Sequence, residues 1–237
     1  MAAGIAATDI PDNLAWSALT GPQANVAETL GRAARYRTGF APLAAVADWA
    51  DDRAWHDLRE LVGAKTPVTV AGGGLAVPDG WETLGRGDGL QLVDVGVAAA
   101  DDAEAVTLTT DDVPEMLELV ARTEPGPFTP RATELGRHLG IRRNGSLVAM
   151  AGQRMRVPGW TEISTVCTDP AYRGQGLASR LVRAHVAEIR RRREAAFLHV
   201  SASNADALRL YLALGFTVRT TTGFAVVRTP TDERADS

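Results

Sequence analysis

The sequence is poor in the residues that build disulfides, metal sites and membrane spans. Cys167 is its single cysteine, which excludes internal disulfides and favours a reducing compartment, the cytoplasm. One cysteine and four scattered histidines do not have the spacing of a typical zinc site, so no metal is expected. No apolar run approaches the ~18 residues of a membrane helix, and residues 1–13 lack the basic segment and apolar core of a secretory signal.

Charged residues make up an ordinary 23% of the chain but are unevenly placed, and Lys65 is the one lysine. Residues 1–104 hold 15 acidic and 7 basic residues (−8), whereas residues 105–237 hold 14 and 18 (+4), which gives the net charge of −4. A basic C-terminal part suits a polyanionic ligand, but Arg190 to Arg193 can equally solvate one end of a helix. The pI near 5.6 and the lack of aromatics among these arginines argue against nucleic acid binding.

The most informative stretch runs from Thr161 to Ala178. Its β-branched, alternating first part predicts a strand, which Asp169-Pro170 ends. A glycine-rich turn follows, and from Leu177 the apolar residues recur with helical spacing. A helix that begins at glycines leaves backbone N–H groups unpaired at its positive end, which is typical of a phosphate site. Arg173 adds a planar, permanently charged group suited to phosphate oxygens.

Two common phosphate loops fit this turn poorly. A Walker loop requires a lysine after its last glycine, and none follows Gly176. The dinucleotide fingerprint is nearly matched by Gly174, Gly176 and Ser179, but it belongs in the first turn of a βαβ unit with an acid about twenty residues later. The strand expected after this helix ends in Val200 to Ser203 without an acid.

A third loop fits better, because Arg173-Gly174-Gln175-Gly176-Leu177-Ala178 resembles the Arg/Gln-x-x-Gly-x-Gly/Ala signature of the GNAT N-acetyltransferase superfamily. The segment from Asn204 to Phe216 resembles the second signature of that family, Asn-x-x-Ala-x-x-x-Tyr-x-x-x-Gly-Phe, with every named position filled. The resemblance covers roughly residues 105–228. It implies an α/β acyl-CoA N-acyltransferase fold, with a mixed, mostly antiparallel sheet that is splayed between the Thr161–Thr168 and Ala196–Val200 strands.

The resemblance also implies the ligand and the residues that hold it. The co-substrate is acetyl-CoA, whose pyrophosphate lies on the glycine turn and whose pantetheine arm pairs with the preceding strand. The implied cofactor-binding residues are Val166, Cys167, Thr168, Arg173, Gly174, Gln175, Gly176, Leu177, Ala178, Asn204 and Tyr211. Tyr211 also occupies the general-acid position of the family, where it would protonate the leaving thiolate.

The general base is less clearly indicated. Strand alternation places Glu162 on the face of Ser164, Val166 and Thr168, so Glu162 is the first candidate, although a solvated strand-end acid is an equal alternative. Glu124, in the proline-rich loop after the first helix of this region, and His199 are lesser candidates. His185 lies on an apolar helix face and is expected to be a buried structural histidine.

Three parts are expected along the chain: an N-terminal α+β region at 1–104, a GNAT domain at 105–228 and a frayed tail at 229–237. The first part resembles the reduced leading half of two-part GNAT proteins. Further expectations are helices at 25–36, 51–62, 111–120 and 205–214, strands at 67–70, 90–93, 105–109 and 196–200, a hairpin over 139–156 turning at Asn144-Gly145, a linker at 97–104, and a terminal hairpin from Phe216.

The sequence therefore predicts a cytoplasmic N-acetyltransferase that transfers acetyl from acetyl-CoA to a primary amine by direct attack. The alternative is a non-catalytic module that binds or senses acyl-CoA. Neither nucleic acid nor a membrane is expected as a partner. The identity of the acceptor and the formation of a homodimer are left open.

Overall fold

The computed structural model describes residues 9–230, which form one sheet of eleven strands. These are β1 (Ala27–Leu30), β2 (Ala33–Tyr36), β3 (Leu43–Val46), β4 (Pro67–Gly72), β5 (Glu82–Asp94), β6 (Val106–Leu108), β7 (His138–Arg143), β8 (Ser146–Val157), β9 (Trp160–Thr168), β10 (Ala195–Ser201) and β11 (Phe216–Arg228). Their order across the sheet is β1-β2-β3-β4-β11-β5-β10-β9-β8-β7-β6. Only the pairs β3–β4 and β9–β10 are parallel, so the predicted mixed, mostly antiparallel sheet is confirmed.

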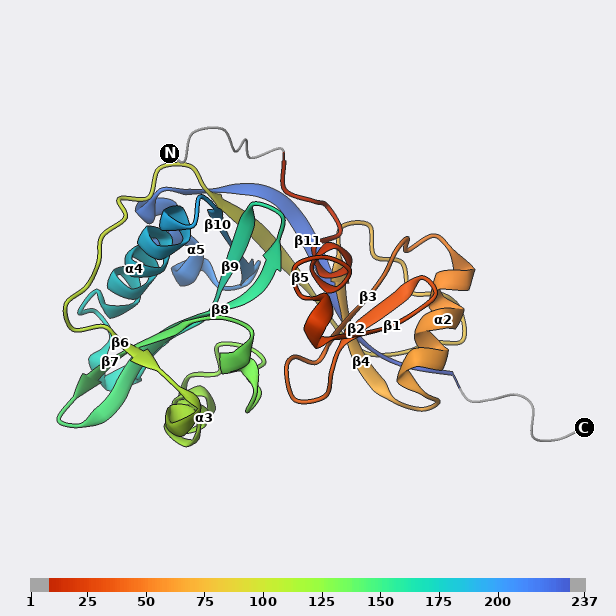
Figure 1. The fold of residues 1–237 in the computed structure, drawn as a ribbon, viewed down its shortest axis with the longest axis horizontal. Coiled ribbons are helices and arrows are strands. Elements are labelled where there is room, and N and C mark those ends of the chain that lie inside the picture. Colours follow the sequence, from red (N-terminus) through yellow and green to blue (C-terminus); the bar gives the residue numbers. More distant parts are fainter. Residues whose placement is uncertain (1–8, 231–237) are drawn as a thin grey trace, which may run out of the picture.

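Two long strands carry the sheet from one half of the molecule into the other. β5 and β11 pair from Phe216↔Asp94 to Arg228↔Glu82, and Figure 1 shows both ribbons crossing between the two lobes. The other edge of β11 pairs with β4. The last strand of the chain is thus inserted among strands of the N-terminal region, and the boundary at residue 104 stays a prediction.

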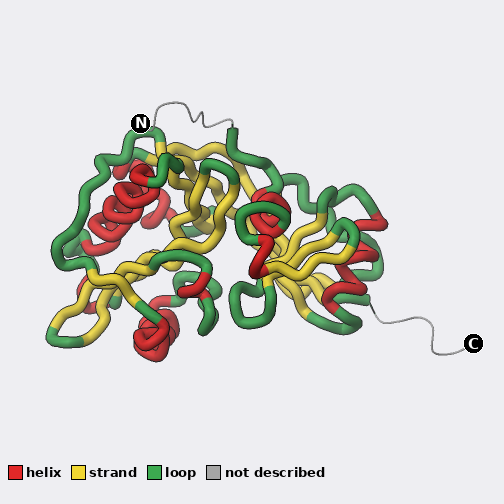
Figure 2. The backbone as a smooth tube through the Cα atoms, viewed as in Figure 1, coloured by secondary structure: helices red, strands yellow, loops and turns green. Residues whose placement is uncertain are grey.

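Five α-helices cover the sheet within the described residues (Figure 2). They are α1 (Leu14–Leu19), α2 (Asp52–Val62), α3 (Val113–Thr123), α4 (Leu177–Arg191) and α5 (Ala205–Leu214), with short 3-10 turns at Ala24–Val26, Thr110–Asp112, Ala132–Glu134 and Pro170–Tyr172. Figure 1 shows α4 and α5 side by side in one lobe, and α2 against the first strands in the other.

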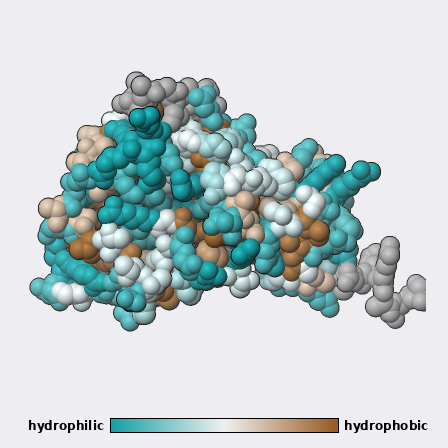
Figure 3. All heavy atoms as spheres, in the orientation of Figure 1, coloured by the Kyte–Doolittle hydropathy of each residue, from teal (hydrophilic) through white to brown (hydrophobic). Residues whose placement is uncertain are grey.

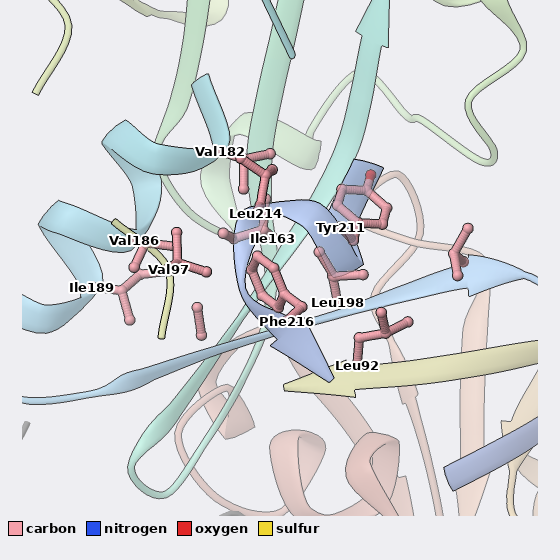
Figure 4. Close-up of a cluster of buried hydrophobic side chains, with 12 residues drawn as sticks. Leu92, Val97, Ile163, Val182, Val186, Ile189, Leu198, Tyr211, Leu214 and Phe216 are labelled. Carbon is pink, nitrogen blue, oxygen red and sulfur yellow. The ribbon is translucent and has the colours of Figure 1, made fainter. Parts of the chain in front are cut away.

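The helix after the glycine turn is held to the sheet by the apolar stripe that the sequence predicts. Val182, Val186 and Ile189 of α4 are fully buried against strands β9 and β10, together with Leu214 and Phe216 from the end of α5 and the start of β11 (Figure 4). Each such side chain contributes about 1.5–3 kcal/mol when it leaves water. The glycine turn at the start of α4 is therefore anchored from behind.

Tryptophans pack together in the core of the N-terminal lobe. Trp55 of α2 lies between Trp49 and Trp81, with ring centroids 5.6 and 5.0 Å away. The side chain of Asp51 accepts a hydrogen bond from the Arg53 N–H and caps α2, which confirms the helix expected at 51–62. Trp16, which belongs to α1, packs instead against a separate apolar cluster that includes Leu19 and Tyr36.

The helix expected at 25–36 is wrong. This segment forms the hairpin of β1 and β2, with Leu30↔Ala33 as the last pair and Gly31 at a φ of +53° in the two-residue turn. The apolar spacing fits a helix by coincidence, whereas glycine in the left-handed region is a hairpin signal. The turn at Asn144-Gly145, with φ values of +51° and +85°, joins β7 and β8 as expected.

The terminal hairpin expected from Phe216 is also wrong, because 216–228 is one long strand. β11 has a register shift between Val218 and Thr220 but does not turn back, since β5 and β4 already occupy its two edges. Of the tail expected at 229–237, the structure describes residues 229 and 230, and Thr229 is held by hydrogen bonds. The buried Thr229 hydroxyl donates to the Gly63 carbonyl at 2.6 Å and accepts from the Thr66 N–H at 2.9 Å, and residues 231–237 lie outside the described part.

Candidate functional site

A groove of about 730 Å³ opens where strands β9 and β10 separate. Their pairing ends at Leu198↔Ile163, although β9 continues to Thr168 and β10 to Ser201. The start of α4, one side of α5 and the loop at 124–127 complete its walls. The predicted splay of the sheet thus creates a long opening whose β9 edge has no neighbouring strand.

The glycine turn forms one end of this groove. Gly174 and Gly176 have φ values of +77° and +73°, a conformation that a residue with a Cβ rarely adopts. Gly176 is the N-cap of α4, and no side chain caps the first turn of the helix. A Cβ at either glycine would meet no atom within 4 Å, so the space over the turn is open. Unpaired N–H groups at the start of a 15-residue helix are suited to binding an anion.

Most arginines of α4 have protein partners and are not free to bind a ligand. Arg180 pairs with Asp102, Arg190 with Asp94 and Arg191 with Asp101, which ties α4 to the segment 94–104. Figure 3 shows the hydrophilic surface that results over this region. The expected linker at 97–104 has neither helix nor strand, and its three acids, Asp101, Asp102 and Glu104, pair with arginines of the C-terminal part. Arg173 remains in the groove, with Nε 3.4 Å from the Thr168 carbonyl oxygen.

A bulge in β9 changes which side chains share a face. Thr165 has a φ of +53°, and the register with β8 shifts between Ser164↔Gly152 and Cys167↔Met150. Ile163 and Val166 therefore both pack on the α4 side, while Cys167 packs against α3. The alternation that groups Glu162 with Val166 and Thr168 is wrong beyond Ser164, because one extra residue reverses the faces.

Glu162 is buried at the base of the groove and has two charged neighbours. Arg154 donates from Nε and Nη2 to the two carboxylate oxygens at 2.9 and 2.7 Å, and His199 Nδ1 lies 2.8 Å from Oε1. Burial would raise the pKa of Glu162, but the charge of Arg154 and the hydrogen bonds from His199 and Arg154 lower it to about 2. An ionised carboxylate requires Nδ1 of His199 to carry the proton, which leaves Nε2 as the acceptor nitrogen.

Residues of the N-terminal region support the Arg154–Glu162 pair from behind. The Gln23 amide donates to the Arg154 carbonyl at 2.8 Å, and its Oε1 accepts from the Tyr36 hydroxyl at 2.6 Å and from the Arg156 N–H at 3.1 Å. Burial and the negative charge of Glu162 raise the pKa of Tyr36, so its hydroxyl stays a donor. A segment without recognisable motifs thus fixes the strand that presents Arg154.

Tyr211 lies on the α5 wall of the groove, deep in the structure. Burial, and to a smaller extent the neighbouring Cys167, raise the pKa of Tyr211 to about 12, so the hydroxyl is protonated at neutral pH. Figure 4 shows its ring at the edge of the apolar cluster, with the oxygen pointing away from Phe216 and Leu198. Asn204 begins α5, and its side chain accepts from the Ala207 N–H at 3.0 Å.

The groove collects nearly all of the residues that the sequence singles out. It is lined by Glu162, Val166, Cys167, Thr168, Arg173, Gly174, Gly176, Leu177, Ala178, Asn204 and Tyr211, whereas Gln175 does not line it. Glu124 also lines it, from the C-cap of α3 at a φ of +47°. Sequence reasoning missed Arg154, although Arg154 and Glu162 are equally distant from Pro158 in the turn of a hairpin.

The remaining titratable candidates are structural or unsupported. His185 is buried, with Nε2 donating to the Ala151 carbonyl at 3.0 Å and Nδ1 accepting from Gln153 at 3.2 Å. Burial raises the pKa of Cys167 to about 11, so the thiol is not a nucleophile. In the part of the chain that the structure describes, no group of three or more His, Cys, Asp or Glu side chains is placed to hold a metal. No helix among residues 9–230 is both long and apolar enough to cross a membrane.

Known proteins resemble this chain in both sequence and structure. Residues 138–225 match the family model described as FR47-like protein. The N-alpha-acetyltransferase RimI of Mycobacterium tuberculosis is 36% identical over 129 residues, which cover 48% of this chain and 80% of the relative. A crystal structure from Novosphingobium aromaticivorans, assigned to the GNAT family of acetyltransferases, is 37% identical, with a TM-score of 0.84 over 93% of this chain and 98% of that one. A GCN5-related N-acetyltransferase from Kribbella flavida, 18% identical with a TM-score of 0.58 over 88% and 90% of the two chains, shares the fold.

The fold, the splayed groove and these relatives define a family of transferases. The chain belongs to the GNAT family of N-acetyltransferases, as its two signatures predict.

Proposed function

We propose that this protein transfers an acetyl group from acetyl-CoA to a primary amine by direct attack of the amine on the thioester. The observation that carries this proposal is one continuous groove with an anion site at one end and the His199–Glu162 pair and Tyr211 farther along. A sensing module would need the anion site but not an acid and a base beside it.

The cofactor would be held by the start of α4 and by the free edge of β9. The pyrophosphate would lie on the N–H groups of residues 174–178, with Arg173 beside it. Each such contact contributes about 0.3–1 kcal/mol when exposed and up to ~2 when partly buried. The pantetheine arm would pair with the backbone of residues 166–168, where β10 has already separated from β9. Asn204 lines the same groove from the start of α5.

His199 is the better general base, and Glu162 acts through it. An alkylamine with a pKa near 10.4 costs roughly 4–5 kcal/mol to deprotonate at pH 7, so a proton acceptor is needed. A carboxylate with a pKa of about 2 that is already engaged by Arg154 accepts protons poorly. His199 Nε2 has no hydrogen-bond partner within residues 9–230, and Glu162 holds the tautomer that exposes its lone pair. Glu162 is thus a positioning residue.

The transfer then balances without a metal. The ammonium of the acceptor gives a proton to His199 Nε2, directly or through water, and the neutral nitrogen forms a bond to the thioester carbon. The tetrahedral intermediate collapses with cleavage of the carbon–sulfur bond, and the Tyr211 hydroxyl donates its proton to the thiolate. The nitrogen of the new amide loses its second proton to the Tyr211 phenolate, directly or through water, and His199 Nε2 releases its proton to solvent, so both side chains return to their starting states. The products are the acetamide and free CoA. We place this reaction in the cytoplasm, which suits a chain with one buried cysteine.

Isothermal titration with acetyl-CoA tests the proposal at its first step. The wild type is expected to bind and Gly176→Asp to lose binding, because a carboxylate would stand where the pyrophosphate lies. Gly176→Ala is the matched control, since it adds a Cβ at the same φ of +73° without charge. NAD should not compete. Absence of acetyl-CoA binding to the wild type would overturn both the enzyme and the sensing module.

Turnover distinguishes the enzyme from the module. Release of free thiol in the presence of an amine, lost in His199→Ala, is expected for a transferase. Tight acetyl-CoA binding without thiol release across a broad panel of amines would instead support the module.

A further inference from the structure

A second cavity, of about 400 Å³, meets the groove at His199. It lies between α1, the loop after β4, and strands β5, β8, β10 and β11. His199 lines both spaces, so a molecule in this cavity can present one end to the imidazole. We propose that the cavity binds the acceptor, a small hydroxylated primary amine of the amino-sugar class. This inference rests on the proposed function.

A row of polar side chains runs across three strands from the imidazole into the cavity. His199 of β10 is the register partner of Gln91 in β5, and Gln91 is the partner of Thr220 in β11. Side chains directly opposite in adjacent strands point to the same face, and strands are ~4.8 Å apart, so the row spans about 10 Å. Thr222 lies two residues beyond Thr220 and also lines the cavity. The span matches a single sugar ring with its amine at His199.

The hydrogen-bonding groups of the cavity carry no free charge. Gln91 is buried, and its Oε1 accepts from Arg219 at 2.9 Å, which leaves its NH₂ group directed away from that partner. Asp12 also lines the cavity, but it is paired with Arg219 at 2.6 Å. No lysine or arginine lines the space. A carboxylate on the acceptor would find no unpaired cation, whereas hydroxyl groups would find amide, threonine and backbone partners.

The N-terminal region supplies much of this wall, including residues outside the match to the family model. Asp12, Leu14, Gln91 and the backbone of 72–74 come from that region, whereas the family model covers 138–225. Apolar contacts from Leu14, Leu43 and Met155 complete a site with an apolar floor and a polar row, as sugar rings require.

Gly73 offers a way to fill the cavity without straining the backbone. It lines the cavity, its φ is not positive, and a Cβ there meets no atom within 4 Å. Gly85 of β5 has the same freedom but lines none of the described cavities, so Gly85→Phe is the matched control for Gly73→Phe.

The experiment measures acetyl transfer by the full chain to glucosamine, putrescine, alanine and an alanine-terminated tripeptide, with acetyl-CoA binding followed by titration. We expect glucosamine to be the best acceptor. Gly73→Phe should raise its KM by about tenfold or more, and Gln91→Ala by about fivefold, while the Kd for acetyl-CoA is unchanged. Gly85→Phe should behave as the wild type.

Two outcomes would overturn the inference. One is preferred transfer to the tripeptide, to alanine or to putrescine. The other is a glucosamine KM that Gly73→Phe and Gln91→Ala leave unchanged. If either result is obtained while acetyl-CoA binding is intact, only the proposed acceptor site is disproved. If the wild type does not bind acetyl-CoA, both the proposed function and this inference are disproved.

Discussion

The two halves of the chain contribute to the candidate site in different ways. Residues 105–230 carry both family signatures, the glycine turn at the start of α4, Tyr211 and the His199–Glu162 pair. Residues 9–104 carry no signature, yet Gln23 and Tyr36 support strand β8, which carries Arg154, and Gln91 lines the second cavity. The comparison teaches that a region without sequence motifs can still form part of a site. A wall or a supporting backbone contact can be made by many different residues, so it produces no recognisable motif.

The two halves are also joined by a shared sheet and by ion pairs. β11 from the end of the chain lies between β4 and β5 of the N-terminal region, so the sheet is continuous. Acids of the segment 94–104 pair with arginines of α4, including Arg190 with the buried carboxylate of Asp94. Part of the opposite charge of the two halves therefore meets at one interface along α4.

Substitution of the proposed base, His199, should lower kcat more than any other change. Such a result would show that the proton-transfer chemistry lies in the C-terminal half. His199→Ala is expected to lower kcat by about 10²–10⁴-fold with the Kd for acetyl-CoA unchanged, because proton acceptance is lost and cofactor contacts are not. Glu162→Gln should lower kcat less and change its pH profile, since the amide no longer fixes the tautomer. Stopped-flow thiol release measures both variants. If His199→Ala weakened acetyl-CoA binding by as large a factor as it lowers kcat, the assignment of His199 as the general base would be contradicted.

Tyr211→Phe tests the acid on the opposite wall. Loss of the hydroxyl should lower kcat by about 10²-fold, because the thiolate then leaves without a positioned proton. With a pKa of about 12, Tyr211 should not itself reduce the wild-type rate below about pH 11. The ring stays packed against Phe216, so thermal unfolding serves as the control. A kcat equal to that of the wild type would remove Tyr211 from the reaction.

A buried histidine in the same half should control stability and not rate. Burial lowers the pKa of His185 from 6.5 to about 4, so the folded state favours the neutral form. Its stabilising contribution is complete above pH 6.5 and is lost as pH falls toward 4, by roughly 3 kcal/mol in total. His185→Gln should flatten this dependence in urea unfolding between pH 4 and 7, and kcat should be little changed. If the free energy of unfolding of His185→Gln depended on pH as steeply as that of the wild type, the assignment of this pH dependence to His185 would be contradicted.

The smallest effect is expected in the support from the N-terminal region. Tyr36→Phe removes the hydroxyl that donates to Gln23, while the Arg156 N–H still satisfies that acceptor. A loss of about 1 kcal/mol of stability and a kcat decrease of less than tenfold are expected. Gln23→Ala should affect kcat more, because it also frees the Arg154 carbonyl. If both variants leave kcat unchanged, the halves are coupled through the sheet alone.

Local patterns predicted the elements whose signals lie close together in the chain. The turn at Asn144-Gly145, the α4 stripe and the capped α2 all follow from a few adjacent residues. The hairpin of β1 and β2 was missed because Val26, Leu30, Ala33 and Ala34 happen to match helical spacing and each strand has only four residues, too few to establish an alternating pattern. β11 was misread as a hairpin because its partners lie more than a hundred residues earlier.

By itself the sequence determined the family, the fold class and the glycine turn that begins α4, since glycines at left-handed φ and a helix start are local requirements. Only the tertiary structure decided the roles around the base. A single bulge at Thr165 reversed the faces of β9, and Arg154 and His199 came to Glu162 from two other strands. Burial and neighbouring charge set the pKa of Glu162, and both depend on what the folded chain brings near it.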